Sequence, residues 1–321
     1  MPDEPPGPVV LPYSCLVGQD ALRRALELAF VAPAIGGVLA SGVRGTAKST
    51  TVRAFAQAVL DDLPVTLPIN ATDDRVLGGW LVESLLEGGG RQQAGLLERA
   101  HRGLLYIDEV NLLDDYVVNI ILDVLSTGVL EIQREGLDRR LVNLSFTLVG
   151  TMNPEEGGLR PQLLDRFGLL VRVSAESAVE QRLAILQTVL RFDEERRRPG
   201  SAWLAAGRER DRNHRAALLA ARERLRQDRV AMPEPMVRLC AELAAELEAD
   251  GHRGEIVTAL AARANAALAG RDAVVPDDVA EVVPMSLVHR RVGASYEADV
   301  EWSVKEQEIT ERVIAGYRTV A

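Results

Sequence analysis

The sequence predicts an α/β protein with a parallel-sheet core and a C-terminal all-helical domain, and three observations predict this class. In the first half of the chain, short apolar runs alternate with helical patterns, which is typical of a parallel sheet covered on both faces. From Ala175 onward only helical patterns remain. Between the first apolar run and the helix after it, residues 42–49 form a motif typical of phosphate-binding loops.

The strands of the core are expected at four apolar runs. These runs cover residues 37–40, 66–69, 103–107 and 144–150. Short apolar runs bounded by glycine, proline or charged residues are typical of strands that are buried on both faces. The core is expected to span residues 1–175, with the proline-rich residues 1–12 disordered.

The second half of the chain is expected to contain a linker and a lid domain. The linker, residues 176–215, begins with an amphipathic pattern over 180–192 and continues as a charged run, which indicates a solvated linker or an exposed helix face. Residues 216–321 are expected to form the helical lid. Its helices are expected at residues 235–249, 255–269 and 276–288, with Gly251 and Gly270 after the first two.

Composition and charge exclude several classes of protein. The 321 residues carry a formal net charge of −10, which disfavours contact with nucleic-acid backbones and anionic membranes. No apolar run approaches the roughly 20 residues that cross a bilayer, and the first residues lack the basic and apolar regions of a signal peptide. Cys15 and Cys240 form no disulfide or zinc motif. The sequence therefore predicts a cytoplasmic protein that binds neither nucleic acid nor membrane.

The loop motif follows the Walker A order of glycine, four residues, glycine, lysine and serine, except that Ala47 replaces the second glycine. Backbone N–H groups in such a loop surround phosphates at a helix N-terminus. Lys48 is expected to reach the β- and γ-phosphates of ATP, and Ser49 to bind Mg²⁺. Because alanine tolerates positive φ poorly, we expect Ala47 to have a conformation that an L-residue accepts. The predicted nucleotide-binding residues are Gly42, Val43, Arg44, Gly45, Thr46, Ala47, Lys48, Ser49 and Thr50.

A second motif argues against the alternative that residues 42–49 are a fortuitous glycine-rich turn. Residues 104–107 are apolar and lead directly into Asp108 and Glu109. A buried strand of this kind delivers two carboxylates to the carboxyl edge of a sheet, where ligands of open α/β sheets bind. Asp108 is expected to hold Mg²⁺, and Glu109 to polarise the attacking water. An exposed helix start would not explain the apolar run, so we expect hydrolysis of ATP.

Two further polar residues are candidates for catalysis. Asn153 follows the run 144–150, where AAA+ enzymes place a first sensor that orients water; the alternative is a turn residue before proline. Arg166 would project toward the nucleotide of a neighbouring subunit as an arginine finger, with Arg160 in reserve. The alternative for Arg166 is a surface arginine paired with Asp165.

Several segments together resemble the magnesium-chelatase I subunits, a family of AAA+ ATPases. The segments are residues 67–78, 100–115 and 150–168 and, near the expected adenine site, Leu16-Val17-Gly18-Gln19. The resemblance covers about residues 12–290. It implies that residues 129–141 form a hairpin before the sensor, with Glu135-Gly136 at or near its turn. It also implies that Arg253 is a lid arginine that faces the γ-phosphate.

The resemblance implies a motor, dependent on ATP and Mg²⁺, that acts in tetrapyrrole biosynthesis and drives a partner to insert a divalent metal, Mg²⁺ or Co²⁺. The family forms rings, commonly hexamers. Its members work with a D subunit that carries an integrin-like (VWA) domain and with a large porphyrin-binding subunit. A MoxR-like remodelling ATPase with an integrin-domain partner and another target is the alternative. A scaffold without turnover is disfavoured by the complete set of candidates, Lys48, Asp108, Glu109, Asn153, Arg166 and Arg253.

Overall fold

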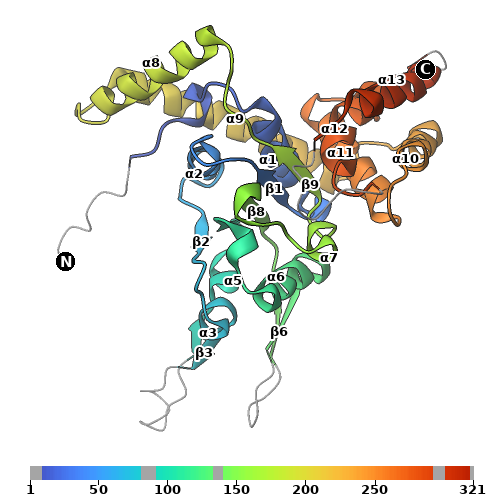
Figure 1. The fold of residues 1–321 in the computed structure, drawn as a ribbon. Helices are drawn as coiled ribbons and strands as arrows, with labels where there is room; N and C mark the ends of the chain where they lie inside the picture. Colours follow the sequence, from blue (N-terminus) through green and yellow to red (C-terminus); the bar gives the residue numbers. More distant parts are fainter. Residues whose placement is uncertain (1–8, 81–91, 133–139, 292–300, 319–321) are drawn as a thin grey trace.

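The chain folds into an α/β core joined to a helical domain (Figure 1), and the computed structural model describes residues 9–80, 92–132, 140–291 and 301–318. The main sheet has the strand order β2-β5-β8-β1-β9, and all neighbouring strands are parallel. Its strands are β1 (Val38–Ser41), β2 (Val65–Leu67), β5 (Leu104–Ile107), β8 (Thr147–Met152) and β9 (Leu169–Arg172). The predicted parallel sheet is thus confirmed, and β9 is a strand that we did not predict.

The sheet is covered on both faces because successive residues of a strand point to opposite sides. Val38 and Ala40 pack in one cluster with α1 (Asp20–Val31) and α2 (Lys48–Leu60). Leu39 packs in a second cluster with α6 (Asp115–Thr127). Every residue of β1, β5 and β8 is buried, which explains why these strands are near-continuous apolar runs in the sequence.

Shorter elements connect the strands of the core. They are η1 (Tyr13–Cys15), η2 (Pro33–Ile35), α3 (Asp73–Leu77), β3 (Gly78–Trp80), β4 (Gln92–Ala94), α5 (Leu96–Arg99), η3 (Val110–Leu112), β6 (Val129–Ile132), β7 (Arg140–Asn143), η4 (Pro154–Glu156) and α7 (Pro161–Leu164). The antiparallel pairing of β6 and β7 confirms the strands of the expected hairpin. Glu135-Gly136, expected at or near its turn, lies outside the described residues.

The second half is helical, as predicted. Its helices are α8 (Val179–Glu195), α9 (Ala202–Arg226), α10 (Glu234–Glu246), α11 (Arg253–Leu268), α12 (Pro276–Leu287) and α13 (Val304–Arg318). α10, α11 and α12 correspond to the three helices expected in the lid. α13 packs against α10 and α12, so part of the C-terminal segment that the resemblance does not cover belongs to this domain.

The charged run expected as a linker is mostly helix. α9 continues past residue 215 to Arg226, so the expected boundary between linker and lid lies inside one helix. α9 packs against α1, α2 and α11, and Asp211 accepts hydrogen bonds from the N–H groups of Tyr13 (2.9 Å) and Ser14 (2.8 Å). These polar contacts and the buried apolar residues Leu218 and Ala221 fix this helix to the core. In α8, where an amphipathic helix was expected, no residue is buried, so its apolar side chains are exposed or only partly covered.

The start of the described chain also departs from expectation. Leu11 and Pro12 are buried, so the disorder expected for residues 1–12 does not extend to their end. Residues 1–8 lie outside the described residues.

Candidate nucleotide-binding site

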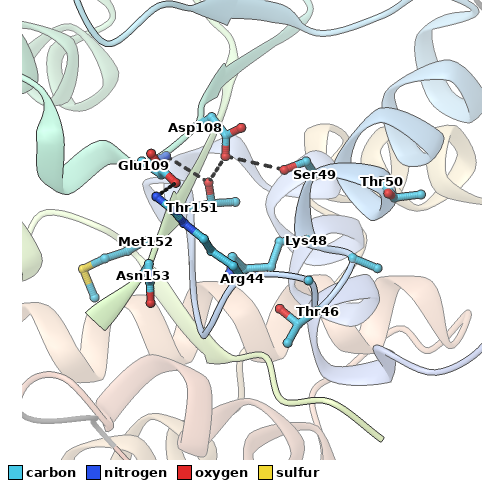
Figure 2. Close-up of a pocket in the computed structure, with 12 residues that line it drawn as sticks. Arg44, Thr46, Lys48, Ser49, Thr50, Asp108, Glu109, Thr151, Met152 and Asn153 are labelled. Atoms are coloured by element: carbon cyan, nitrogen blue, oxygen red, sulfur yellow. Dashed lines mark hydrogen bonds and ion pairs between the residues drawn. The ribbon is translucent and has the colours of Figure 1, made fainter. Parts of the chain in front are cut away.

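The phosphate loop lines a cavity of about 290 Å³ together with the residues that follow β5 and the end of β8. Figure 2 shows the loop and the start of α2 facing Asp108 and Glu109, with Thr151 between them. The loop packs closely from behind, since a side chain at Gly42 would lie 2.0 Å from the main-chain oxygen of Val173. The two motifs that the sequence places 60 residues apart thus share one cavity, which the parallel order of β1, β8 and β5 explains.

The side chain of Lys48 folds back over the phosphate loop. Its Nζ donates hydrogen bonds to the main-chain oxygens of Gly42 and, at 2.9 Å, Val43. Burial lowers the pKa of Lys48, and the carboxylates of Asp108 and Glu109 partly oppose that shift. The ammonium group is therefore held in the cavity by weakly basic carbonyls, which a phosphate oxygen can replace as a stronger partner.

Ala47 has the conformation that we expected it to avoid. Its φ is 62° and its ψ is 19°, in the left-handed region, and it directly precedes the first residue of α2. A left-handed conformation costs an L-residue about 1–2 kcal/mol. The loop therefore keeps the backbone path that glycine normally provides, and it carries strain at this position.

Replacing Ala47 with glycine is expected to leave ATP affinity within about tenfold of the wild type, because the anion site is formed by backbone N–H groups. Removal of the left-handed strain offsets part of the entropy cost of glycine in the unfolded chain. Calorimetric titration with ATP and a thermal melt measure both effects. A complete loss of binding would show that the loop depends on the alanine side chain.

Oxygen atoms suited to Mg²⁺ meet at the floor of the cavity. Ser49 Oγ lies 3.5 Å from Asp108 Oδ1, and both line the cavity beside the phosphate loop. Hydroxyl and carboxylate oxygens are ligands that Mg²⁺ prefers, usually with substrate phosphates and water as the others. The described residues contain no group of three His, Cys, Asp or Glu that could form a metal cage. The donor set fits a cation shared with a nucleotide.

Two residues that the sequence analysis did not select hold the carboxylate of Asp108. Thr151 Oγ1 donates to Asp108 Oδ1 (2.7 Å) and accepts from the N–H of Glu109 (3.1 Å). The hydroxyl of Tyr106 lies 2.8 Å from Asp108 Oδ1 and 2.9 Å from Ser49 Oγ, and burial raises its pKa to about 12. Tyr106 lies on β5 two positions before Asp108, and Thr151 lies on β8 two positions before Asn153. Because side chains two positions apart on an extended chain point to the same side, this spacing could have identified both residues from the sequence.

Glu109 is held in a strained position at the rim of the cavity. Its φ of 56° and ψ of 60° lie in the left-handed region, directly before η3. Arg44, from the phosphate loop, forms an ion pair with Glu156 and lies 3.7 Å from Glu109 Oε1. The strained backbone and the bond to Thr151 together point the carboxylate toward the loop (Figure 2).

Asn153 lines the same cavity and is 3% exposed. Its Oδ1 accepts a hydrogen bond from the N–H of Glu155 at 3.3 Å, so it also caps η4 before Pro154. The two interpretations of this residue are therefore compatible, since it occupies the position expected of a sensor and performs the turn function. Its role as a sensor stays a prediction.

A second cavity, of about 390 Å³, adjoins the phosphate loop. It is lined by Leu16, Val17 and Gln19 from the expected adenine segment, by loop residues and by Leu186 and Val189 of α8. Gln19 Nε2 donates to the main-chain oxygen of Thr46 at 3.1 Å, which joins the segment to the loop. An apolar cavity next to a phosphate loop suits a purine base.

The candidate arginines are not brought to the cavity, although all of them are among the described residues. Arg166 Nη1 lies 3.9 Å from Asp123 Oδ1 of α6, at a separate surface groove between α6 and β6. The alternative pairing with Asp165 is not formed. Arg160, the reserve candidate, pairs with Asp115 at 2.6 Å. Neither guanidinium group lines the phosphate cavity of its own chain.

Arg253, which the resemblance implies to face the γ-phosphate, also lies elsewhere. Its Nη1 is 3.8 Å from Asp165 Oδ2, next to the turn that carries Arg166, and it does not line the phosphate cavity. Arg253 thus contacts the residue next to Arg166 in the chain, although the guanidinium of Arg166 itself lies at Asp123. The structure groups the lid arginine with the finger candidate and not with Lys48.

In the part of the chain that the structure describes, no helix combines the length and apolar character needed to cross a membrane.

Comparisons with known proteins agree with the site. Residues 37–167 match the family model described as AAA domain (dynein-related subfamily), and residues 237–313 match the AAA lid domain. A solved structure of a protein from Cytophaga hutchinsonii is 19% identical, with a TM-score of 0.63 over 94% of this chain and 90% of that one, and it shows the fold alone.

Two relatives of known family are considerably more similar. The magnesium-chelatase 38 kDa subunit of Acidiphilium rubrum is 38% identical over 87% of this chain and 90% of its own length. The subunit of the same name from Cereibacter sphaeroides is 40% identical over 87% of this chain and 91% of its own length. Together with the AAA domain and the two motifs in one cavity, these relatives show an ATPase, and the chain belongs to the magnesium-chelatase I-subunit family.

Proposed function

We propose that this chain is the ATP-hydrolysing motor of a chelatase complex, in which partner subunits insert a divalent metal, Mg²⁺ or Co²⁺, into a tetrapyrrole. The observation that carries the proposal is the convergence of Lys48, Asp108 and Glu109 on one cavity, in a chain 38–40% identical to magnesium-chelatase subunits. A motor of this kind needs groups that bind phosphate and groups that activate water, and the cavity contains both.

Each side chain of the cavity has a distinct proposed role. The loop N–H groups and Lys48 bind the phosphates, with Lys48 giving up its bonds to the loop oxygens. Ser49 and Asp108 would hold Mg²⁺, which when bound neutralises charge on the β- and γ-phosphates. Glu109 orients the attacking water, and Asn153 lies where it can align the same water. Thr151 holds the carboxylate of Asp108 and the backbone N–H of Glu109 in fixed positions relative to each other.

The arginines suggest that the complete site spans two subunits. Arg166 lies outside the cavity of its own chain, at the groove beside α6, so its guanidinium is available to a neighbour. Arg253 shares Asp165 with this region and would approach the same neighbour. A ring, commonly a hexamer in this family, brings every Arg166 to an adjacent phosphate loop. A D-type subunit with an integrin-like domain and a large porphyrin-binding subunit would complete the complex.

Reconstitution tests the substrate. The chain is mixed with the D-type and porphyrin-binding subunits of a related magnesium chelatase, with a metal-free porphyrin or another metal-free tetrapyrrole as acceptor, and with Mg²⁺ or Co²⁺ as the metal. ATP-dependent change of the acceptor spectrum is expected, and it should be lost with the Glu109→Gln chain. An ATPase that is stimulated by an integrin-domain partner but supports insertion into neither acceptor would favour a remodelling ATPase.

A further inference from the structure

One side chain of the helical domain holds the turn that carries Arg166. Arg290 stands three residues after α12, and its guanidinium donates to main-chain oxygens on both sides of Arg166. Nη2 donates to Asp165 (2.7 Å) and Phe167 (2.6 Å), and Nη1 donates to Gly168 (2.9 Å). Three of the four carbonyl groups in the turn between α7 and β9 are thus satisfied by a single planar group.

The charge of Arg290 is also satisfied at this turn. Its side chain is 1% exposed, and Nε lies 3.0 Å from Asp165 Oδ1. The neighbouring His289 contributes a further contact, with Nε2 3.0 Å from the main-chain oxygen of Phe167. A buried cation is tolerated only where several acceptors surround it. The acceptors of the turn therefore stabilise the charge of Arg290, and Arg290 in return holds the backbone of the turn.

The start of α11 packs against the same arginine. A side chain at Gly254 would lie 2.7 Å from Leu287 Cδ2 and 3.5 Å from Arg290 Cδ, so glycine allows α11 to approach the end of α12. Arg253, the residue before it, reaches Asp165 from this place. The lid arginine and Arg290 therefore both pair with one carboxylate of the finger turn, that of Asp165.

Arg166 itself points away from these contacts. Its own N–H donates to Leu163 (3.1 Å), and its guanidinium lies at the groove beside Asp123, on α6. Phe167 fixes the turn to the sheet, since it is fully buried and packs tightly on Gly150 of β8, where an added Cβ would lie 3.2 Å from its ring. The backbone of the turn is thus fixed from inside, while the finger side chain remains at the surface.

We infer that Arg290 is a positioning residue for the arginine finger: it fixes the backbone around Arg166 to the lid, so that the finger reaches the neighbouring nucleotide only when the lid is seated. The inference rests on the proposed role of Arg166. Arg290 touches no part of its own phosphate cavity, so it acts on catalysis through the turn alone.

Arg290→Lys tests the inference, because lysine keeps the charge but cannot span three carbonyl oxygens with one planar group. A displacement of about 1 Å in a catalytic group can cost roughly 10²-fold in rate, so we expect kcat for ATP to fall by about that factor. The affinity for ATP, measured with a fluorescent nucleotide, is expected to stay within about twofold, since the cavity is untouched. An unchanged kcat would overturn the inference.

A double-mutant cycle separates positioning from a general structural role. In an Arg166→Ala background, Arg290→Lys is expected to cause no further loss of kcat, because the group it positions is already absent. Equal losses in both backgrounds would overturn the inference while leaving the finger intact. A wild-type rate in Arg166→Ala alone would instead refute the proposed finger, and with it the route by which Arg290 acts.

Two further variants guard against misfolding. Arg291→Lys is the matched control, because Arg291 bonds Val288 and pairs with Glu306 of α13, away from the finger turn, and full activity is expected. If Arg290→Lys does not fold, His289→Phe removes the polar contact with the main-chain oxygen of Phe167 and leaves Arg290 in place. It is expected to lower kcat by a smaller factor that again disappears in the Arg166→Ala background; a loss that persists there would overturn the inference.

Discussion

Replacing Arg166 with alanine is expected to slow ATP hydrolysis by about 10³- to 10⁵-fold while ATP still binds. The proposed finger would stabilise charge that develops on the transferring phosphoryl group, whereas the guanidinium of Arg166 lies outside the phosphate cavity of its own chain, so binding should persist. Phosphate release and nucleotide affinity, measured on the same preparation, give the two quantities. Normal hydrolysis by Arg166→Ala would refute the assignment, and Arg160 would be tested next.

Mixing two inactive variants tests whether Arg166 acts on the nucleotide of a neighbouring subunit. Arg166→Ala and Glu109→Gln are each expected to be nearly inactive, but a mixed ring contains interfaces that join an intact Glu109 to an intact Arg166. Activity is therefore expected to reappear in the mixture. The matched comparison is a mixture of Arg166→Ala with Arg166→Ala/Glu109→Gln, which has no complete interface and should stay inactive. Equal and restored activities in the two mixtures would contradict a site shared between subunits.

Glu109→Gln is expected to bind ATP normally and to hydrolyse it about 10²- to 10⁴-fold more slowly. The amide keeps the size of the side chain and the backbone bond to Thr151, but it is too weak a base to polarise water. Turnover with saturating ATP measures the loss. Wild-type turnover in this variant would exclude Glu109 as the base.

Lys48→Ala is the complementary control. It removes a charged donor from the phosphates, so affinity for ATP is expected to fall about 10- to 100-fold. A variant that bound ATP as tightly as Glu109→Gln does would place the phosphates away from Lys48. The pair of variants thus separates binding from water activation in one cavity.

The sequence predicted the core well because its strands are buried on both faces and its motifs stand at strand ends. β9 was not among the predicted strands, and Leu169–Arg172 directly follows the arginine segment. The charged run over 193–215 was expected to be a solvated linker or an exposed helix face, because its many charged residues mask those, such as Asp211, that bind the core. Tertiary contacts of this kind leave no periodic pattern in a sequence.

The candidate site was predictable in its composition but less so in its conformation. Lys48, Ser49, Asp108 and Glu109 meet as expected, since each belongs to a motif with fixed spacing. The prediction for the backbone conformation of Ala47 was wrong, because the path of the loop outweighs the preference of an alanine for negative φ. The partner of Arg253 could not be predicted, because it depends on how the lid packs against the turn after α7. The partner of Arg166 could not be predicted, because it depends on how α6 packs beside the same turn.

The left-handed backbone conformation of Glu109 lowers the stability of the fold at a residue proposed for catalysis. A non-glycine residue in this region costs of the order of 1–3 kcal/mol, and the surrounding bonds must hold it there. Glycine would adopt the same φ and ψ without that cost, so a search for thermostable variants would tend to discard the carboxylate. If Glu109 has the role of base proposed above, the chain keeps a less stable residue where the reaction needs that group, and stabilising designs should leave this position unchanged.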